Sequence, residues 1–279
     1  MSDAAAIRAP ARSYLFVPAT HPERIGRAIG SGADAVIVDF EDAVAPDAKV
    51  SAREGLAGSW PQWQARAAAA GVSLLVRVNA TDSEYHAGDL AWCRVQRARD
   101  LVLPKADAAA LHALALALPH ANCYPLMETA AGFADLRAVS RAAGVVRLLL
   151  GSIDLMFDLD VADEDEPLDY FRARLVMHSR AAGLPAPVDG VCTAIGDAVE
   201  LARQTTRARR FGFGAKLLIH PQQVAQVHAG LAPSERERAW AQRIVAAAAG
   251  AQGAAVAVDG KMVDRPVLER ARRILRQAG

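Results

Sequence analysis

Residues 35–42 of the chain read AVIVDFED, in which four apolar residues lead into three acidic residues within four positions. A run this short is typical of a β-strand, and its unbroken apolar character is typical of a parallel strand covered on both faces. Seven more short runs rich in Val, Ile and Leu share this pattern and are bounded by Pro, Gly or Asp. The eight predicted strands are 13–17, 35–39, 74–78, 101–103, 123–127, 147–150, 186–188 and 216–219.

Alanine-rich stretches with helical character separate these runs. The predicted helices are 22–30, 47–57, 85–98, 106–118, 132–143, 168–182 and 196–208. Eight strands that alternate with helices predict an α/β protein in which residues 1–221 form a (β/α)8 TIM barrel. An open doubly wound sheet is the alternative, but the number of strands and the length of the chain favour the barrel.

The alternation stops after Pro221, and three further elements are predicted there. They are a helix at 234–249 opened by a Ser234–Glu237 capping box, an extended segment at 253–262 interrupted by the turn dipeptide Asp259-Gly260, and a helix at 266–277. We expect residues 222–279 to form a C-terminal extension of helices and a hairpin that packs on the barrel or on a neighbouring subunit.

Charge and composition exclude several classes of protein. The chain has 279 residues, with 32 Lys and Arg against 31 Asp and Glu, which gives a net charge of +1. This balance argues against a nucleic-acid-binding protein and offers no basic patch for an anionic membrane. The three cysteines fit neither a disulfide framework nor a zinc site, and no apolar signal segment precedes Tyr14. We expect a cytoplasmic protein with reduced cysteines and with neither nucleic-acid nor membrane partners.

Polar residues close most of the predicted strands. In a parallel barrel the carboxyl ends of the strands meet at one rim, where catalytic groups lie. The residues at or just beyond these ends are Asp39, Glu41, Asp42, Arg77, Asn79, Lys105, Glu128, Ser152, Asp154, Asp189 and His220. Several of them are carboxylates, which repel one another unless a cation intervenes. The sequence therefore predicts a site for a hard divalent metal ion.

Glu128 and Asp154 are the preferred metal ligands, because each follows a buried strand and the two strands are neighbours in a barrel. Magnesium typically takes one or two protein carboxylates and completes its octahedron with water and substrate oxygens. A helix N-cap or a salt bridge is the alternative for any single strand-end carboxylate. Asp39, Glu41 and Asp42 are interpreted as an anchor for metal-bound water, and we count Glu41 among the candidate catalytic residues.

Arg77 lies inside the apolar run LLVRV, where a cation is costly unless it is paired. It is interpreted either as a buried ion pair with one of the acids or as a fork that binds a substrate carboxylate, and both roles are compatible. The candidate substrate-binding residues are Arg77, Glu128, Gly151 and Ser152. His220 is interpreted as a structural residue rather than a general base.

Eight motifs in order give the chain a resemblance that covers nearly its whole length. They are RSYLFVPATHPER (12–24), GADAVIVDFEDAVAPDAK (32–49), VRVN (76–79), LPK (103–105), PLMETAAG (125–132), GSIDL (151–155), GFGAKLLIHPQQ (212–223) and DGKMVDRP (259–266). The sequence resembles the citrate lyase beta-chain-like branch of the HpcH/HpaI aldolase superfamily, which includes malyl-CoA and citramalyl-CoA lyases. One departure is Ile153 before Asp154, where many members carry an acid, which indicates a different subfamily.

The resemblance implies a (β/α)8 barrel that forms a trimer or hexamer, with a C-terminal lid that reaches a neighbour's active site. The residues that it implies are Glu128 and Asp154 for Mg²⁺, Arg77 for the substrate, Asp264 as an acidic residue of the lid, and Arg12, Phe16, Pro18 and Arg24 around coenzyme A (CoA).

The implied activity is magnesium-dependent, reversible cleavage of a 3-hydroxy-3-carboxyacyl-CoA, such as citramalyl-CoA or malyl-CoA, to acetyl-CoA and an α-keto acid. Three alternatives remain. They are a citrate lyase beta chain that acts on a citryl thioester of an acyl-carrier partner, a class II aldolase without a thioester substrate, and a non-catalytic CoA-binding regulatory subunit.

Overall fold

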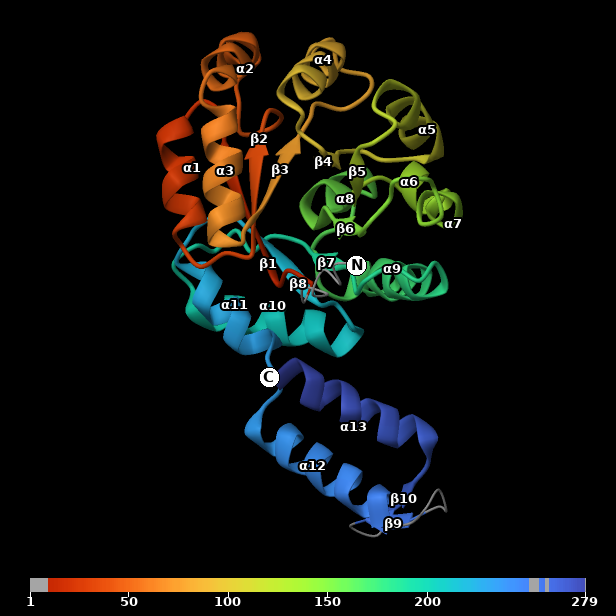
Figure 1. Ribbon diagram of the computed structural model, residues 1–279. Helices are drawn as coiled ribbons and strands as arrows, with labels where there is room; N and C mark the ends of the chain where they lie inside the picture. Colours follow the sequence, from red (N-terminus) through yellow and green to blue (C-terminus); the bar gives the residue numbers. More distant parts are fainter. Residues whose placement is uncertain (1–9, 251–255, 259–260, 279) are drawn as a thin grey trace, which may run out of the picture. The chain divides into compact units, whose positions relative to one another are not determined.

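The computed structural model of the protein describes residues 10–250, 256–258 and 261–278. Eight parallel strands, hydrogen-bonded in sequence order, form a closed barrel because the last strand pairs with the first (Figure 1). The strands are β1 (Ser13–Pro18), β2 (Ala35–Asp39), β3 (Ser73–Arg77), β4 (Asp100–Leu103), β5 (Asn122–Met127), β6 (Leu149–Leu150), β7 (Val188–Asp189) and β8 (Ala215–Leu218). The predicted TIM barrel is confirmed, and the alternative of an open sheet is wrong.

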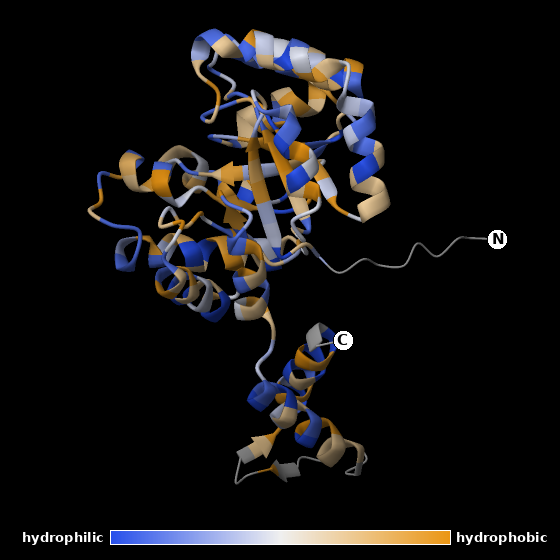
Figure 2. Cartoon of the chain, turned by 90° about the vertical axis from the view of Figure 1, so that its left-hand side faces the viewer, coloured by the Kyte–Doolittle hydropathy of each residue, from blue (hydrophilic) through white to orange (hydrophobic). Residues whose placement is uncertain are grey.

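Helices follow the strands around the barrel (Figure 1). They are α1 (Pro22–Ile29), α2 (Lys49–Ala57), α3 (Trp60–Ala70), α4 (His86–Gln96), α5 (Ala108–Ala117), α6 (Ala130–Ala134), α7 (Leu136–Val139), α8 (Ser152–Asp158), α9 (Asp169–Ala181), α10 (Ala198–Phe211) and α11 (Gln223–Leu231), with short 3-10 turns at Pro46–Ala48 and Glu166–Leu168. Figure 2 shows that the barrel strands are mainly apolar, whereas the helices carry both apolar and polar residues.

Several helices differ from those predicted. The sequence analysis missed α3, although Pro61 lies in its first turn and Gly71 ends it in the left-handed region at a φ of 68°. The single helix predicted at 132–143 is two short helices, α6 and α7, with Asp135 at the junction between them. It also missed α8, which begins directly after β6.

The chain divides into two compact units, residues 1–228 and residues 229–279. The first unit extends beyond the predicted boundary at Pro221 because α11 follows β8 and buries Val224 and Val227. The eighth strand therefore has its own helix, as the seven strands before it do.

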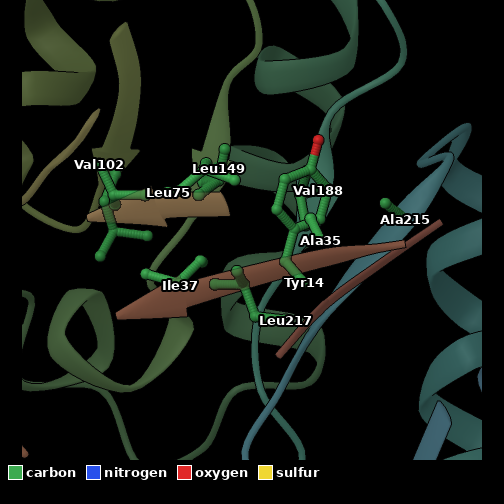
Figure 3. Close-up of a cluster of buried hydrophobic side chains, with 10 residues drawn as sticks. Tyr14, Ala35, Ile37, Leu75, Val102, Leu149, Val188, Ala215 and Leu217 are labelled. Atoms are coloured by element: carbon green, nitrogen blue, oxygen red, sulfur yellow. The ribbon is translucent and has the colours of Figure 1, made fainter. Parts of the chain in front are cut away.

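Side chains from alternate positions of the strands fill the barrel interior, as Figure 3 shows. The cluster consists of Tyr14, Ala35, Ile37, Leu75, Val102, Leu126, Leu149, Val188, Ala215 and Leu217. Successive side chains of a strand point to opposite faces, so a residue two positions beyond an interior residue also points inward. Asp39, Arg77 and Glu128 each lie two positions beyond a member of this cluster, so they bring charge to the carboxyl end of the interior.

The second unit contains α12 (Glu235–Gly250), β9 (Val256–Val258), β10 (Lys261–Val263) and α13 (Arg265–Ala278). Strands β9 and β10 pair as an antiparallel hairpin, and its predicted turn, Asp259-Gly260, lies outside the described residues. The buried residues between the helices and the hairpin are Ala241, Ile244, Val263, Ala271 and Ile274. The capping box forms as predicted, because the Glu237 N–H donates to Ser234 Oγ at 3.2 Å and the Ser234 N–H donates to Glu237 Oε2 at 2.8 Å.

Among the helices in the described ranges, none is both long enough and apolar enough to cross a bilayer.

Candidate active site

Arg77 and Asp39 form a bidentate ion pair at the carboxyl ends of β3 and β2. The two residues are partners in the register of the parallel pair. Arg77 Nε lies 2.7 Å from Asp39 Oδ1, and Arg77 Nη2 lies 2.6 Å from Asp39 Oδ2. Both are buried, with 8% of Arg77 and 1% of Asp39 exposed. Burial by itself lowers the pKa of Arg77, but the carboxylates around it, Asp39 above all, raise its pKa well above the ordinary value.

Two further acids share the remaining terminal nitrogen of Arg77. Its Nη1 lies 2.9 Å from Glu41 Oε2 and 3.1 Å from Asp42 Oδ2. The pKa of Glu41 is raised to about 7, with burial as the main cause. The negative charges of Asp42 and Asp39 also raise this pKa, and the positive charge of Arg77 opposes them. The side chain of Asp42, in contrast, is 66% exposed, so it is the most replaceable of the three partners of Arg77.

The predicted CoA residues do not all lie together. The ring of half-buried Phe16, on β1, stacks on Arg77 with 4.8 Å between the guanidinium carbon and the ring centroid. Pro18 ends β1 at the same edge of the barrel, and Arg24 is exposed on α1. Arg12 precedes the amino end of β1, where its Nε lies 3.6 Å from Asp34 Oδ2. The structure therefore places Arg12 at the opposite end of β1 from Pro18.

Glu128 directly follows β5 and is 2% exposed. Its Oε1 accepts a hydrogen bond of 2.7 Å from the backbone N–H of Lys105, which has a positive φ of 47°. Among the described residues, Glu128 Oε2 is buried and has no hydrogen-bond partner. Burial raises the pKa of Glu128 well above its ordinary value, and the negative charges of Glu41 and Asp154 raise it further.

Asp154 lies in the first turn of α8 rather than directly at the end of β6. Desolvation of the carboxyl group and the negative charge of Asp42 raise its pKa, while the positive charges of Arg77 and Lys105 oppose the shift. Because the charge of Asp154 acts on the pKa of Glu128 and the charge of Arg77 acts on both, the three side chains lie within electrostatic range of one another, and we refer to them as the charged group.

Gly151 and Ser152 lie where β6 passes into α8, and Gly151 packs against Glu128. A β-carbon on Gly151 would lie 2.6 Å from the Cβ of Glu128, so only glycine leaves room for the glutamate side chain. Ser152 is 1% exposed, packs against Gly190, and has no hydrogen-bond partner for its Oγ among the described residues.

The donor set fits magnesium. In the part of the chain that the structure describes, no three His, Cys, Asp or Glu side chains form a metal-binding group. Glu128 and Asp154, the two predicted ligands, would be the protein's contribution to such a site, and two carboxylates are within the number that Mg²⁺ usually takes. Because a buried carboxylate oxygen without a partner is costly, the free Oε2 of Glu128 is the atom that such an ion would satisfy.

Other predicted residues have structural partners. Asp189 forms a buried ion pair with Lys216 at 2.8 Å, and His220 Nδ1 accepts the Gln222 N–H at 3.3 Å. Asp264 belongs to the second unit, where its Oδ1 accepts the Val267 N–H at 3.1 Å at the start of α13.

Lys49 and Asn79 hold the turn after β2, and Asn79 is one of the predicted strand-end residues whereas Lys49 was missed. Lys49 Nζ donates to the backbone oxygen of Phe40 at 3.0 Å and to that of Glu41 at 2.8 Å. Asn79 Nδ2 donates to the same Phe40 oxygen at 3.0 Å and to Asp89 Oδ2 at 2.7 Å. Lys49 closes the motif GADAVIVDFEDAVAPDAK, and this position was the available signal.

Comparison with known proteins gives consistent relatives. The chain is 36% identical over 281 residues to a (3S)-malyl-CoA thioesterase from Cereibacter sphaeroides, covering 96% of this chain and 95% of the relative. It is 33% identical over 281 residues to a citrate lyase subunit beta-like protein from Mycobacterium tuberculosis, covering 98% and 97%.

Solved structures agree with these relatives. The crystal structure of the protein CitE from Mycobacterium tuberculosis, in complex with magnesium, acetoacetate and coenzyme A, matches with a TM-score of 0.86 and 31% identity, covering 98% of this chain and 100% of that one. The family model for HpcH/HpaI aldolase/citrate lyase matches residues 12–221, which include the whole barrel as far as the end of β8. The chain therefore belongs to the HpcH/HpaI aldolase/citrate lyase family.

Proposed function

We propose that this protein is a magnesium-dependent carbon–carbon lyase. It reversibly cleaves a 3-hydroxy-3-carboxyacyl-CoA, such as citramalyl-CoA or malyl-CoA, to acetyl-CoA and an α-keto acid. The observation that carries the proposal is Glu128 Oε2, a buried oxygen with no hydrogen-bond partner among the described residues, within electrostatic range of Arg77. The homologous crystal structure with magnesium, acetoacetate and coenzyme A supports it.

Glu128 and Asp154 would hold the magnesium ion, which supplies Lewis-acid stabilisation of negative charge on the substrate's hydroxyl and carboxylate oxygens. The two hydrogen bonds to Asp39 hold the plane of the Arg77 guanidinium and therefore fix the orientation of its third nitrogen, Nη1. A substrate oxygen can replace the exposed carboxylate of Asp42 at Nη1. The positive charge of Arg77 then stabilises the negative charge that develops on this oxygen.

Cleavage breaks the bond between the hydroxyl-bearing carbon and the carbon next to the thioester. The hydroxyl loses its proton and becomes the carbonyl of the α-keto acid, and the electron pair of the broken bond forms the enolate of acetyl-CoA. We propose that Glu41 is the base that takes the proton of the hydroxyl group, and that Asp264 from the lid of a neighbouring subunit is the acid that donates a proton to the enolate and forms the methyl group of acetyl-CoA. Asp264 caps α13 in the second unit, which is the predicted lid.

We propose that the CoA portion lies along Phe16, Pro18 and Arg24, and that Gly151 and Ser152 line the acyl group. The predicted place of Arg12 around CoA stays a prediction, and its Nε lies 3.6 Å from Asp34 Oδ2, at the opposite end of β1 from Pro18. We further propose that the protein is a cytoplasmic homotrimer or hexamer.

Thioester hydrolysis is a second candidate, because relatives at 32% to 36% identity are named (3S)-malyl-CoA thioesterases. The two reactions release different products. The lyase releases acetyl-CoA and an α-keto acid, whereas hydrolysis releases free CoA thiol and the intact hydroxy acid.

The deciding experiment incubates the purified protein and Mg²⁺ with malyl-CoA, citramalyl-CoA and citryl-CoA and separates the products by chromatography. Acetyl-CoA with an equimolar α-keto acid supports the lyase, and free thiol with intact hydroxy acid favours the thioesterase. Turnover only after a citryl-loaded acyl-carrier protein is added would favour the citrate lyase beta chain. Binding of acetyl-CoA without any turnover would favour a regulatory subunit.

A further inference from the structure

Lys49 is a buried lysine with unusual partners. It is the first residue of α2 and is 8% exposed. Its Nζ donates to the backbone oxygens of two consecutive residues, Phe40 at 3.0 Å and Glu41 at 2.8 Å. Both oxygens belong to the turn that follows β2 and carries the acids around Arg77.

Among the described residues, the charge of Lys49 has no acidic partner. Over the described residues, none of the ion pairs within 4.0 Å includes it, and the aromatic ring of Tyr85 lies 5.6 Å from Nζ. Burying an ammonium without a carboxylate is expensive, so such a lysine normally keeps its head group in water. Lys216, which is also buried, is 1% exposed and has Asp189 at 2.8 Å. Lys49 therefore directs all of its polar contacts to the turn.

The turn is held from a second side as well. The Phe40 oxygen also accepts from Asn79 Nδ2 at 3.0 Å, and the Phe40 N–H donates to the Arg77 oxygen at 2.9 Å. Asp89, which is completely buried, accepts from Asn79 and from Arg53. Phe40 is thus held by Arg77 of β3 and, through Asn79 and Asp89, by α4. The Glu41 oxygen also accepts the Val44 backbone N–H at 3.0 Å, and the Glu41 N–H donates to Asp39 Oδ1 at 2.9 Å. Among the described residues, Lys49 supplies the side-chain donor to the Glu41 oxygen.

We propose that Lys49 is a positioning residue for the active site. By holding the backbone oxygens of Phe40 and Glu41, it sets the direction in which the Glu41 carboxylate approaches Arg77, where Oε2 lies 2.9 Å from Nη1. This inference rests on the proposed function, because it assigns Glu41 and Arg77 to the catalytic site. A purely structural lysine would stabilise the barrel without acting through Glu41.

The test is a double-mutant cycle between Lys49→Met and Glu41→Gln. Lys49→Met keeps the length of the side chain and removes its donors. Alone, it should lower kcat about 10- to 100-fold and leave KM for the acyl-CoA within about twofold. In the Glu41→Gln background it should cause little further loss, because two residues that act as a unit are not additive.

Lys216→Met is the matched control, since it removes another buried lysine that contacts Asp189 rather than the turn. It should lower thermal stability, and any effect on kcat should multiply with that of Glu41→Gln. Lys49→Gln keeps one N–H donor group and covers the case in which Lys49→Met does not fold. It should give a smaller loss with the same dependence on Glu41.

An equal loss of kcat from Lys49→Met in both backgrounds, or a loss of thermal stability alone, would overturn the proposal. If the wild-type protein cleaves none of the esters, the proposed function fails, and the same cycle is measured by calorimetric binding of pyruvate in the presence of Mg²⁺. Weaker binding in Lys49→Met that disappears in the Glu41→Gln background would still support the positioning role. Independent effects on binding would overturn it.

Discussion

Gly151 lies so close to Glu128 that a β-carbon at position 151 would come within 2.6 Å of the Glu128 Cβ, and closer still to its carboxylate. Real side chains do not approach one another this closely, so the glutamate holds its place because residue 151 has no side chain. The absence of one methyl group thus determines where the buried carboxylate of Glu128 lies.

Gly151→Ala should therefore displace Glu128 and weaken Mg²⁺ binding about 10- to 100-fold, with a parallel loss of activity. The measurement is calorimetric titration with Mg²⁺. Gly55→Ala is the control, because a β-carbon there meets nothing within 4 Å inside α2. It should leave metal binding unchanged and stabilise the protein by about 0.5–1 kcal/mol. Equal metal affinity in Gly151→Ala would refute the close approach.

Arg77→Lys should lower kcat about 100-fold or more with a smaller effect on KM. Lysine keeps the charge but lacks the fork that binds both oxygens of Asp39, so its ammonium is not aimed at the substrate. Steady-state kinetics with the best ester of the panel measure this. A kcat within a factor of two of wild type would show that charge alone is sufficient at this position.

Arg77→Met should lower the free energy of unfolding by about 3–5 kcal/mol, because it leaves Asp39 and Glu41 buried without their cation. Adding Asp39→Asn to Arg77→Met should recover part of this loss, since it removes one of the stranded charges. Urea unfolding of the two variants measures the difference. If the double variant is no more stable than Arg77→Met, the loss arises from packing rather than from charge.

The barrel was predictable because its strands are continuously apolar and its helices lie between them, so local pattern and fold agree. Glu128 and Arg77 were predictable for a related reason, since Glu128 directly follows an apolar run and Arg77 interrupts one. Asp154 was selected by the same logic, although it lies one turn into α8. The signal at that point was the Gly151-Ser152 pair, which indicates a helix start rather than a strand end.

Other features required coordinates. The role of Lys49 depends on a contact across eight residues between α2 and the turn after β2, and the motif that ends at Lys49 does not show which atoms its side chain contacts. Arg12 lies in the same motif as Phe16 and Pro18, but it precedes β1 at the amino end of the barrel, whereas Pro18 lies at the carboxyl end. Neighbours in sequence are therefore not neighbours in the site, which is why the predicted CoA set separates.

Asp34 should make stability depend on pH at the amino end of the barrel. Burial alone raises its pKa, but the hydrogen bond with His228 and the backbone N–H of Arg12 outweigh burial and lower the pKa below its ordinary value. A carboxylate with a lowered pKa in the folded state stabilises fully above its unfolded pKa of about 4, and this stabilisation is lost as the pH falls through the folded value.

Asp34→Asn should accordingly be less stable than wild type at pH 7, and the difference should shrink below about pH 4. Urea midpoints of both proteins at the neutral and the acidic pH give the comparison. A difference that is the same at both pH values would show that the charge of Asp34 contributes nothing to stability.

The most direct test of the account is calorimetric titration of Mg²⁺ into the wild-type protein and into Glu128→Gln and Asp154→Asn, with circular dichroism to show that each variant is folded. Both substitutions keep the shape of the side chain and remove its charge. We predict one Mg²⁺ site in the wild type and a loss of at least about 10-fold in affinity in each variant. Wild-type affinity in either folded variant would contradict the assignment of that residue as a ligand and, with it, the magnesium-dependent lyase.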